Sequence, residues 1–158
     1  MILYRRCIAY IGVIKMICTF FGHRDCPDKI KNTLKSEIKR LITEKGITLF
    51  YVGNKGAFDR LVYSCLKEIK KEYEYINFYV VLEKIPSKTN IYERDETILP
   101  QGIENVPPRF AIIYRNKWML EKAQYVITYV TRSMGGAARF SALASKREKK
   151  VINIADII

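Results

Sequence analysis

The sequence predicts an α/β protein, a single Rossmann-like three-layer α/β/α domain built on a mostly parallel five-stranded sheet. Two observations carry this prediction. Five short runs of apolar and β-branched residues recur along the chain, and segments with apolar residues at i, i+3 and i+4 lie between them. A chain of 158 residues fits one domain with a proper core. Because strands that alternate with helices form parallel sheets with right-handed crossovers, we expect the strand order 3-2-1-4-5.

The first strand–helix unit begins at Met16, where a continuous apolar run starts. Residues 17–21 (ICTFF) form the first strand. A helix follows, which Asp25 caps and Pro27 begins. Its apolar face consists of Ile30, Leu34, Ile38, Leu41 and Ile42.

The second unit is a strand over residues 47–52 and a helix over residues 58–69, which keeps helical spacing until the charged KKEYE run. A third strand occupies residues 76–82. The segment that follows, residues 83–108, has no regular pattern. Connections of this length are typically lids, binding loops or disordered segments, and we expect a lid over a nucleotide.

The last part of the chain repeats the same alternation. A third helix runs over residues 109–122 and starts at the pair Pro107-Pro108. A fourth strand occupies residues 125–130, a fourth helix residues 135–147, and a fifth strand residues 151–154.

Residues 1–15 are expected to be an extension that precedes a domain over residues 16–158. Arg5 and Arg6 precede an apolar run that is too short to span a bilayer, and no small-residue cleavage site follows it. The sequence therefore predicts no membrane partner. The extension is interpreted as an added edge strand or as a product of start-site choice, with Met16 as a natural start.

Charge and cysteine content narrow the function classes. The chain has 28 Lys and Arg against 16 Asp and Glu, a formal charge of +12, which attracts phosphates of any kind. The cations are scattered through amphipathic segments, as in ordinary solvated helix faces. The four cysteines form no CxxC pair, which argues against a zinc knuckle and a disulfide framework. Reduced thiols are typical of a cytoplasmic protein.

Three glycine-bearing loops converge at the switch point of the predicted sheet, between the first and fourth strands, where α/β sheets bind ligands. They read GHRD, GNKGAFD and TRSMGG, and each opens a helix. Since N–H groups at a helix N-terminus attract anions, we expect a pocket for a phosphate-bearing small molecule. The candidate ligand-binding residues are Gly22, His23, Arg24, Gly53, Asn54, Gly56, Asp59, Arg115, Thr131, Arg132, Ser133, Met134, Gly135 and Gly136.

The glycine pair of this set carries the phosphate hypothesis. Two glycines inside a helix cost roughly 1 kcal/mol each relative to alanine, so the pair suggests a need for bare backbone. We expect the amides of Gly135 and Gly136 to hold phosphate together with Arg24 and Arg132. The alternative is a structural turn flanked by ordinary surface charges.

The other polar candidates have two interpretations each. Asp59 binds a ribose hydroxyl or orients its own loop. Arg115 braces the third helix, with Asn116 and Trp118, or reaches a ligand phosphate. His23 donates to phosphate or packs against the sheet; with Cys26 it provides too few ligands for a metal site, so no metal is expected.

The segments CTFFGHRD, VGNKGAFD, RNKWMLEKAQYVITYV and SMGGAARFSALA, in this order, resemble the SMF/DprA-LOG (SLOG) superfamily, and most closely its branch of small bacterial and phage proteins. The resemblance covers roughly Met16 to the end. It implies a Rossmann-like fold that binds nucleotides or nucleotide-derived signals. Members include the cytokinin-activating LOG phosphoribohydrolases, a recombination factor that binds single-stranded DNA, and sensor domains of bacterial defence systems.

One departure from the LOG enzymes decides the expected activity. Their PGGxGTxxE motif supplies a glutamate that, with an arginine, supports cleavage of the N-glycosidic bond. The matching place here reads SMGGAARF, with Ala137 and Ala138 at the Gly-Thr positions and no glutamate one turn on. Compared with the LOG enzymes, this sequence therefore keeps the glycine pair of the phosphate loop and lacks the glutamate. The catalytic residues stay unassigned and an enzyme is not favoured.

Three functions follow from these observations. The first is binding or sensing of a nucleotide or nucleotide-derived ligand, with no other cofactor. The second is a phosphoribohydrolase-like N-glycosidase acting on nucleoside monophosphates, and the third is a single-stranded nucleic-acid binder. A homodimer through the first or third helix is compatible with the sequence. Substitute carboxylates for the second function are Asp59, Glu83, Glu93 and Asp95.

Overall fold

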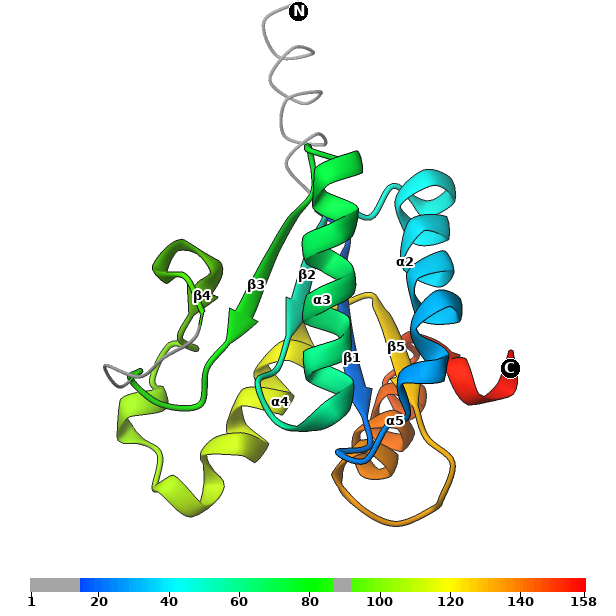
Figure 1. Ribbon diagram of the computed structural model, residues 1–158. Helices are drawn as coiled ribbons and strands as arrows, with labels where there is room; N and C mark the ends of the chain where they lie inside the picture. The colour runs from blue at the N-terminus through cyan, green and yellow to red at the C-terminus, as the bar shows by residue number, and fades with distance from the viewer. Residues whose placement is uncertain (1–14, 87–91) are drawn as a thin grey trace, which may run out of the picture.

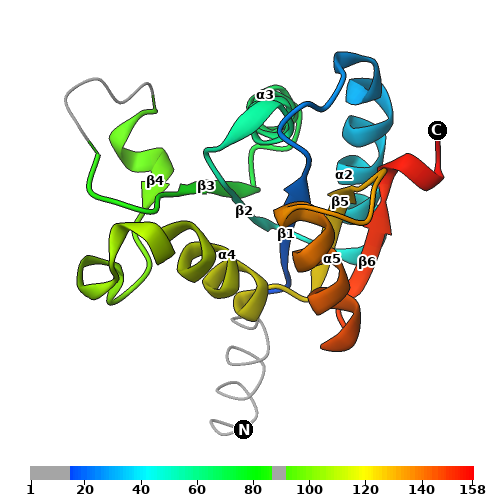
Figure 2. The ribbon, with the colours of Figure 1, turned by 90° about the horizontal axis from the view of Figure 1, so that it is seen from below.

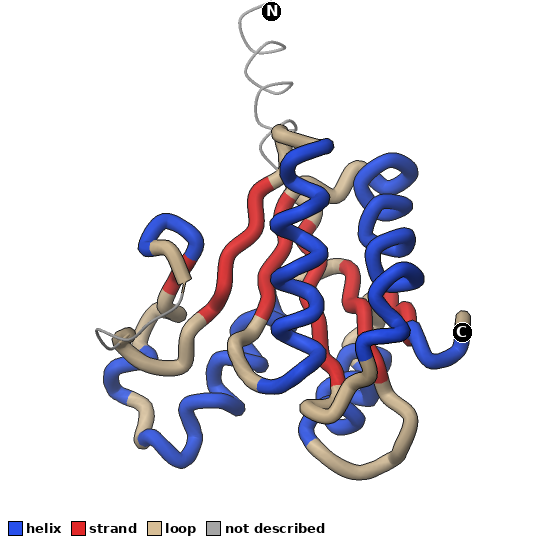
Figure 3. The backbone as a smooth tube through the Cα atoms, viewed as in Figure 1, coloured by secondary structure: helices blue, strands red, loops and turns tan. Residues whose placement is uncertain are grey.

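The computed structural model describes residues 15–86 and 92–158. They form three layers, with a parallel six-stranded sheet in the middle (Figure 1, Figure 3). Figure 2 shows helices α2 and α3 on one face of the sheet and helices α4 and α5 on the other. The strands are β1 (Ile17–Gly22), β2 (Leu49–Val52), β3 (Asn77–Val81), β4 (Thr97–Ile98), β5 (Tyr125–Tyr129) and β6 (Lys150–Asn153), and the helices are α2 (Lys31–Lys45), α3 (Gly56–Glu72), α4 (Ala111–Lys122) and α5 (Gly136–Lys146).

The strand order is β4-β3-β2-β1-β5-β6. The predicted order 3-2-1-4-5 is confirmed for the five expected strands, with one strand more than predicted. The additional strand β4 pairs in parallel with the end of β3, where Val80 lies opposite Thr97 and Val81 opposite Ile98. A strand of two residues carries no periodic signal, which is why the sequence does not reveal it. The predicted extension at residues 1–15 lies, except for Lys15, outside the described residues.

The start of the first helix differs from the prediction. Residues 28–30 form a short 3-10 turn before α2 begins, and neither element has a side-chain cap. Asp25 therefore does not cap the helix. Its carboxylate instead pairs with Arg132, which lies in the loop after β5.

The segment predicted to be a lid is attached to the body of the domain over its described residues. The Glu96 carboxylate accepts a hydrogen bond from the Tyr63 hydroxyl of α3 at 2.6 Å and pairs with Lys67. Tyr92 packs edge-on against the Tyr63 ring, with 5.1 Å between ring centroids. These contacts fix the segment beside α3 and the sheet edge, so the lid prediction is wrong for this part of the chain.

The sheet is buried on both faces, but unequally. The larger apolar core lies between the sheet and the helices α2 and α3, and it includes Leu34, Leu41, Phe58, Leu66 and Phe50. The smaller one lies under α4 and α5, and it includes Phe21, Met119, Leu120, Val126 and Phe140. Of the helices in the described residues, none combines the length and apolar character that crossing a membrane requires.

Candidate functional site

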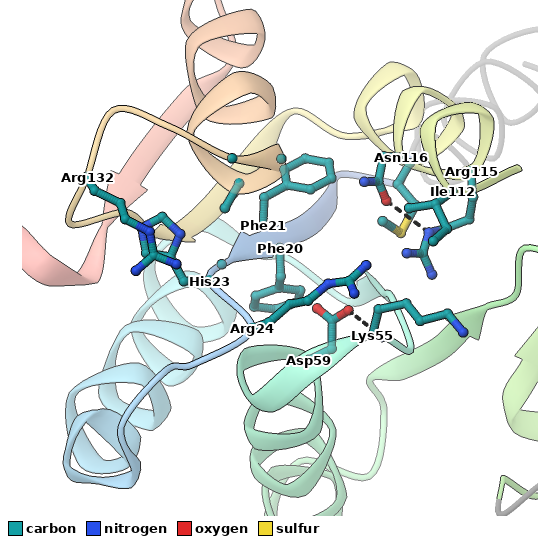
Figure 4. A pocket seen from close by; sticks show the side chains of 15 residues that line it. Phe20, Phe21, His23, Arg24, Lys55, Asp59, Ile112, Arg115, Asn116 and Arg132 are labelled. Atoms are coloured by element: carbon teal, nitrogen blue, oxygen red, sulfur yellow. Dashed lines mark hydrogen bonds between the residues drawn. The ribbon is translucent and has the colours of Figure 1, made fainter. Parts of the chain in front are cut away.

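A cavity of about 380 Å³ opens at the carboxyl edge of the sheet. Figure 4 shows that its walls come from the loops after β1, β2 and β5 and from α4. Because β1 leads to β2 on one side and pairs with β5 on the other, the cavity lies at the switch point of the sheet. Its lining residues are Phe20, Phe21, Gly22, His23, Arg24, Lys55, Asp59, Ile112, Arg115, Asn116, Met119, Arg132, Gly135, Gly136 and Ala137.

The predicted site residues divide into two groups in the structure. The first group lines the cavity: Gly22, His23, Arg24, Asp59, Arg115, Arg132, Gly135 and Gly136. The second group lies behind or beside it: Gly53, Asn54, Gly56, Thr131, Ser133 and Met134. Of the second group, Asn54 and Thr131 bond to lining side chains, whereas Met134 is 78% exposed.

Arg115 is the most deeply buried cation of the site, with 2% of its surface exposed. Its Nη1 donates to Asn54 Oδ1 at 2.7 Å and to the Val81 carbonyl at 3.0 Å, and its Nε donates to Asn116 Oδ1 at 2.9 Å. Burial lowers the pKa of Arg115, while the nearby carboxylate of Asp59 raises it. A guanidinium stays protonated in proteins, so the cavity has a fixed positive charge in its wall.

Asp59 faces this cation from the first turn of α3 and is 9% exposed. One carboxylate oxygen accepts a hydrogen bond from the Lys55 backbone N–H at 2.9 Å. Burial raises the pKa of Asp59 to about 6, although Arg115 and the Lys55 bond oppose the rise. The side chain therefore changes charge close to neutral pH, and it both orients its loop and lines the cavity.

Gly53 allows the acid and the guanidinium to approach one another. A Cβ atom at this position would lie 2.6 Å from Asp59 Oδ2 and 3.1 Å from Arg115 Cζ. Any side chain would push both groups away. The glycine is thus required by the packing of two charged residues, although it does not line the cavity itself.

The glycine pair forms the beginning of α5. Gly135 has φ +98°, which favours glycine, and a Cβ at either Gly135 or Gly136 would meet nothing within 4 Å apart from the neighbouring residues and the backbone of the same helix. No side chain caps this end of the helix. The N–H groups of its first turn therefore lack a side-chain acceptor beside open space. Protein geometry requires glycine at position 135, and the absence of a side chain at position 136 has no such cause.

Two contacts tie the loops after β1 and β5 together. His23 is 5% exposed, and its Nε2 accepts a hydrogen bond from the Thr131 N–H at 3.0 Å. Burial and the neighbouring Arg132 lower the pKa of His23, which favours the neutral ring with its proton on Nδ1. Arg132 and Asp25 form a two-pronged ion pair at 2.9 and 3.2 Å on the surface.

Cations outnumber carboxylates in the lining of the cavity, but most of them have an acidic partner. The lining cations are Arg24, Lys55, Arg115 and Arg132, against the single carboxylate of Asp59. Lys55 also pairs with Glu83 at 3.0 Å, and the second oxygen of this buried carboxylate has no partner among the described residues. Arg132 pairs with Asp25 and Arg115 lies beside Asp59, so three of the four lining cations have an acidic neighbour. Arg24 has no carboxylate partner among the described residues and gives the cavity an excess of positive charge, which suits an anion. Within the described residues, no three His, Cys, Asp or Glu side chains come together in a way that could hold a metal ion.

Sequence reasoning missed several contributors to this cavity. Lys55 belongs to the GNKGAFD loop, but a lysine between two glycines has no signature of its own. Ile112 and Met119 lie on the inner face of α4, and their helical spacing marks them as core residues only. Of the carboxylates expected to substitute for the lost glutamate, Glu93 and Asp95 are placed elsewhere, in a groove beside Lys70 and α3.

Comparisons with known proteins give the fold. No protein-family model matches the chain, and no curated protein matches its sequence. The structure matches the X-ray structure of DNA processing protein A (DprA) from Streptococcus pneumoniae with a TM-score of 0.65, at 13% sequence identity. The match covers 87% of this chain and 49% of that one, so the chain spans about half the length of the matched protein. This protein therefore has the Rossmann-like fold of DprA, as the resemblance to the SLOG superfamily predicts.

Proposed function

We propose that this protein binds a nucleotide or a nucleotide-derived small molecule, with a phosphate at the N-terminal end of α5. The observation that carries the proposal is the cavity at the switch point, where Arg24, the lining cation with no carboxylate partner among the described residues, and the uncapped first turn of α5 border open space. Helix N-termini of this kind bind anions because unpaired N–H groups and the helix dipole act together.

The other groups of the cavity fit the rest of a nucleotide. Arg24 forms no ion pair with a carboxylate among the described residues, so its guanidinium is free for a phosphate. Asp59 is a buried acceptor on the opposite wall and suits a ribose hydroxyl. Arg132 is held by Asp25 and needs to exchange this partner in order to bind the ligand directly.

The first experiment is a thermal shift with a panel of mononucleotides, dinucleotides, and cyclic and ADP-ribose derivatives. A ligand that binds only the native state stabilises it by RT ln(1 + [L]/Kd), about 2.7 kcal/mol at one hundred times Kd. The wild type is expected to shift with a selective subset of the panel. A panel without any shift at millimolar ligand would contradict the proposal.

The variant Gly136→Val tests the location of the phosphate. A Cβ at this position meets no atom within 4 Å apart from the neighbouring residues and the backbone of its own helix, so we expect the fold to stay intact while the added side chain occupies the place of the phosphate. Ser145→Val, on the exposed far part of the same helix, is the matched control and is expected to bind normally. If Gly136→Val and Ser145→Val bind the nucleotide with equal affinity, the phosphate does not bind at the N-terminal end of α5.

A second function, N-glycosidic cleavage of nucleoside monophosphates, is favoured by one observation. Asp59 is a buried carboxyl with a pKa of about 6 that lines the cavity opposite Arg115, as suits a general acid or base. Release of free base from a nucleoside monophosphate, measured by chromatography, is then expected in the wild type and absent in Asp59→Asn. If the wild type, Asp59→Asn and buffer alone all give the same amount of free base, the protein does not cleave the nucleotide and the binding function remains.

A binding assay with single-stranded DNA, repeated at several salt concentrations, separates the small ligand from nucleic acid. A preformed pocket for one small ligand predicts a shallow dependence of affinity on salt, whereas neutralisation of many phosphates predicts a steep one. If affinity falls steeply with salt and the protein prefers the oligonucleotide, its ligand is nucleic acid and the proposal of a small ligand is wrong.

A further inference from the structure

A second cavity, of about 540 Å³, lies between α4 and α5. These two helices cover the same face of the sheet (Figure 2). The second cavity shares Ile112, Asn116, Gly135 and Gly136 with the first. The two cavities are therefore two lobes of one cleft, which meet beside the N-terminal end of α5. We call them the polar lobe and the α4–α5 lobe.

The lining of the α4–α5 lobe has a different chemistry. Apolar and small residues dominate it, namely Ile113 of α4 and Ala138, Phe140 and Ala142 of α5. Ser133 and Arg139 add polar groups, and no carboxylate lines it. Small apolar walls with a few polar groups suit a flat ring such as a nucleobase. The polar lobe, with its four cations and Asp59, suits phosphate and sugar instead.

The order of groups in a nucleotide connects the two lobes. The proposed function places phosphate at α5 and ribose near Asp59, in the polar lobe. In a nucleoside 5′-phosphate the base is attached to this ribose, so it remains on the ribose side of the phosphate. Only a group bonded to the far side of the phosphate extends into the α4–α5 lobe.

The boundary between the lobes leaves room for such a connection. Gly135 and Gly136 belong to both linings, and a Cβ at either residue would meet nothing within 4 Å apart from the neighbouring residues and the backbone of the same helix. A phosphate or pyrophosphate bridge can therefore cross close to the backbone there. This also gives a reason for glycine at position 136, which backbone conformation does not require.

We propose that the ligand carries a nucleoside on each side of a phosphate or pyrophosphate bridge, and that the α4–α5 lobe holds the second nucleoside. The inference rests on the proposed function, since it uses the phosphate position at α5. It names the ligand class as dinucleotide-like and assigns the second subsite to α4 and α5.

Isothermal titration of the full chain tests this with ADP and P1,P2-diadenosine pyrophosphate, and with GDP and its diguanosine counterpart. Each pair shares the pyrophosphate and differs by one nucleoside. In at least one pair the dinucleotide is expected to bind at least tenfold more tightly. Ala142→Phe fills the α4–α5 lobe from an exposed position, and it is expected to remove this gain while the mononucleotide Kd stays within twofold.

Ser145→Phe places the same ring on α5 outside both linings and is expected to change neither affinity. Equal affinities within both wild-type pairs would overturn the inference without any variant, and so would an equal loss of both ligands in Ala142→Phe. In these cases mononucleotide binding by the wild type leaves the proposed function standing. Absence of binding by all four nucleotides would overturn the inference, and the thermal-shift panel then decides separately whether the proposed function stands.

Discussion

The α2–α3 layer and the α4–α5 layer cover the same sheet and are built differently. Under α2 and α3 lies the larger apolar core, which includes the fully buried Leu34, Leu66 and Phe58. Under α4 and α5 the core is smaller, and both lobes of the cleft open along these helices. One layer therefore provides most of the apolar burial, and the other leaves space for a ligand.

The ion pairs between helices also differ between the two layers. Across the first layer, Lys31 and Lys35 of α2 pair with Glu68 of α3 at 2.8 and 2.9 Å, and Lys39 pairs with Glu72 at 2.9 Å. On α4 and α5, by contrast, Lys117, Lys122, Arg139 and Lys146 have no carboxylate within 4 Å among the described residues. Lys45, Arg60, Lys70 and Lys71 of α2 and α3 likewise have no carboxylate within 4 Å among the described residues. The two layers therefore differ in the ion pairs that join their helices, which are present between α2 and α3, and not in the number of unpaired cations.

The largest expected effect tests whether one polar side chain holds α4 to the sheet. In Arg115→Met, the acceptors on Asn54, Val81 and Asn116 lose their donor, and Asp59 loses its neighbouring positive charge. We expect a loss of about 3–5 kcal/mol in unfolding free energy by urea titration and a further rise in the pKa of Asp59.

Arg115→Lys is the matched variant for this test. It keeps the charge and loses the planar fork, so its stability is expected to lie between those of the wild type and Arg115→Met. If Arg115→Met unfolds like the wild type, the layer is held by apolar packing alone and the contrast between the two layers disappears.

Leu66→Ala probes the apolar side of the comparison. Leu66 is fully buried on α3, and its truncation is expected to cost about 3 kcal/mol in unfolding free energy through lost burial and the cavity left behind. Leu143→Ala on α5, where the side chain is only partly buried, is expected to cost less. Nucleotide affinity of the folded Leu66→Ala protein should stay unchanged. Equal costs in the two variants would contradict the division of stability between the layers.

The pH dependence of stability isolates Asp59. Burial raises its pKa to about 6 from about 3.9 in an unfolded chain, so between these values the native state binds a proton that the unfolded state has released. Its contribution to stability is complete below about pH 4 and is lost as pH rises through about 6, a decrease of about 3 kcal/mol. The difference in unfolding free energy between wild type and Asp59→Asn, measured at pH 4.5, 5.5 and 6.5, should follow this curve. A difference independent of pH would show that Asp59 is not buried as described.

The smallest expected effect concerns the surface ion pair between Asp25 and Arg132. Asp25→Asn removes a negative charge near the cavity and frees the guanidinium for the ligand. We expect nucleotide affinity to rise by a few fold, most at low salt, with an unchanged melting temperature. Arg132→Ala is expected to weaken binding several-fold. If Asp25→Asn binds less tightly than the wild type, the ion pair organises the loops and Arg132 is not a ligand group.

The sequence predicts the fold well because each long element has its own periodicity. The runs at 17–21 and 125–130 and the helix at 58–69 are strongly apolar or amphipathic, and they lie where expected as β1, β5 and α3. The two-residue β4 and the role of Asp25 depend on contacts between segments far apart in the chain, which local patterns do not contain. The glycine loops are visible in the sequence because their pattern is local, whereas the places of Lys55 and Ile112 in the cavity and the existence of the α4–α5 lobe are seen only in the structure.

Gly53 has a consequence for the history of this protein. Because a methyl group at this position would displace both Asp59 and Arg115, the three residues are not free to drift independently. A lineage that abandons the acid or the guanidinium releases the glycine, and one that keeps both retains it. In distant homologues, the joint presence of Gly53, Asp59 and Arg115 is therefore stronger evidence of a shared chemistry than the glycine pair at the start of α5, because glycine pairs also occur in ordinary turns.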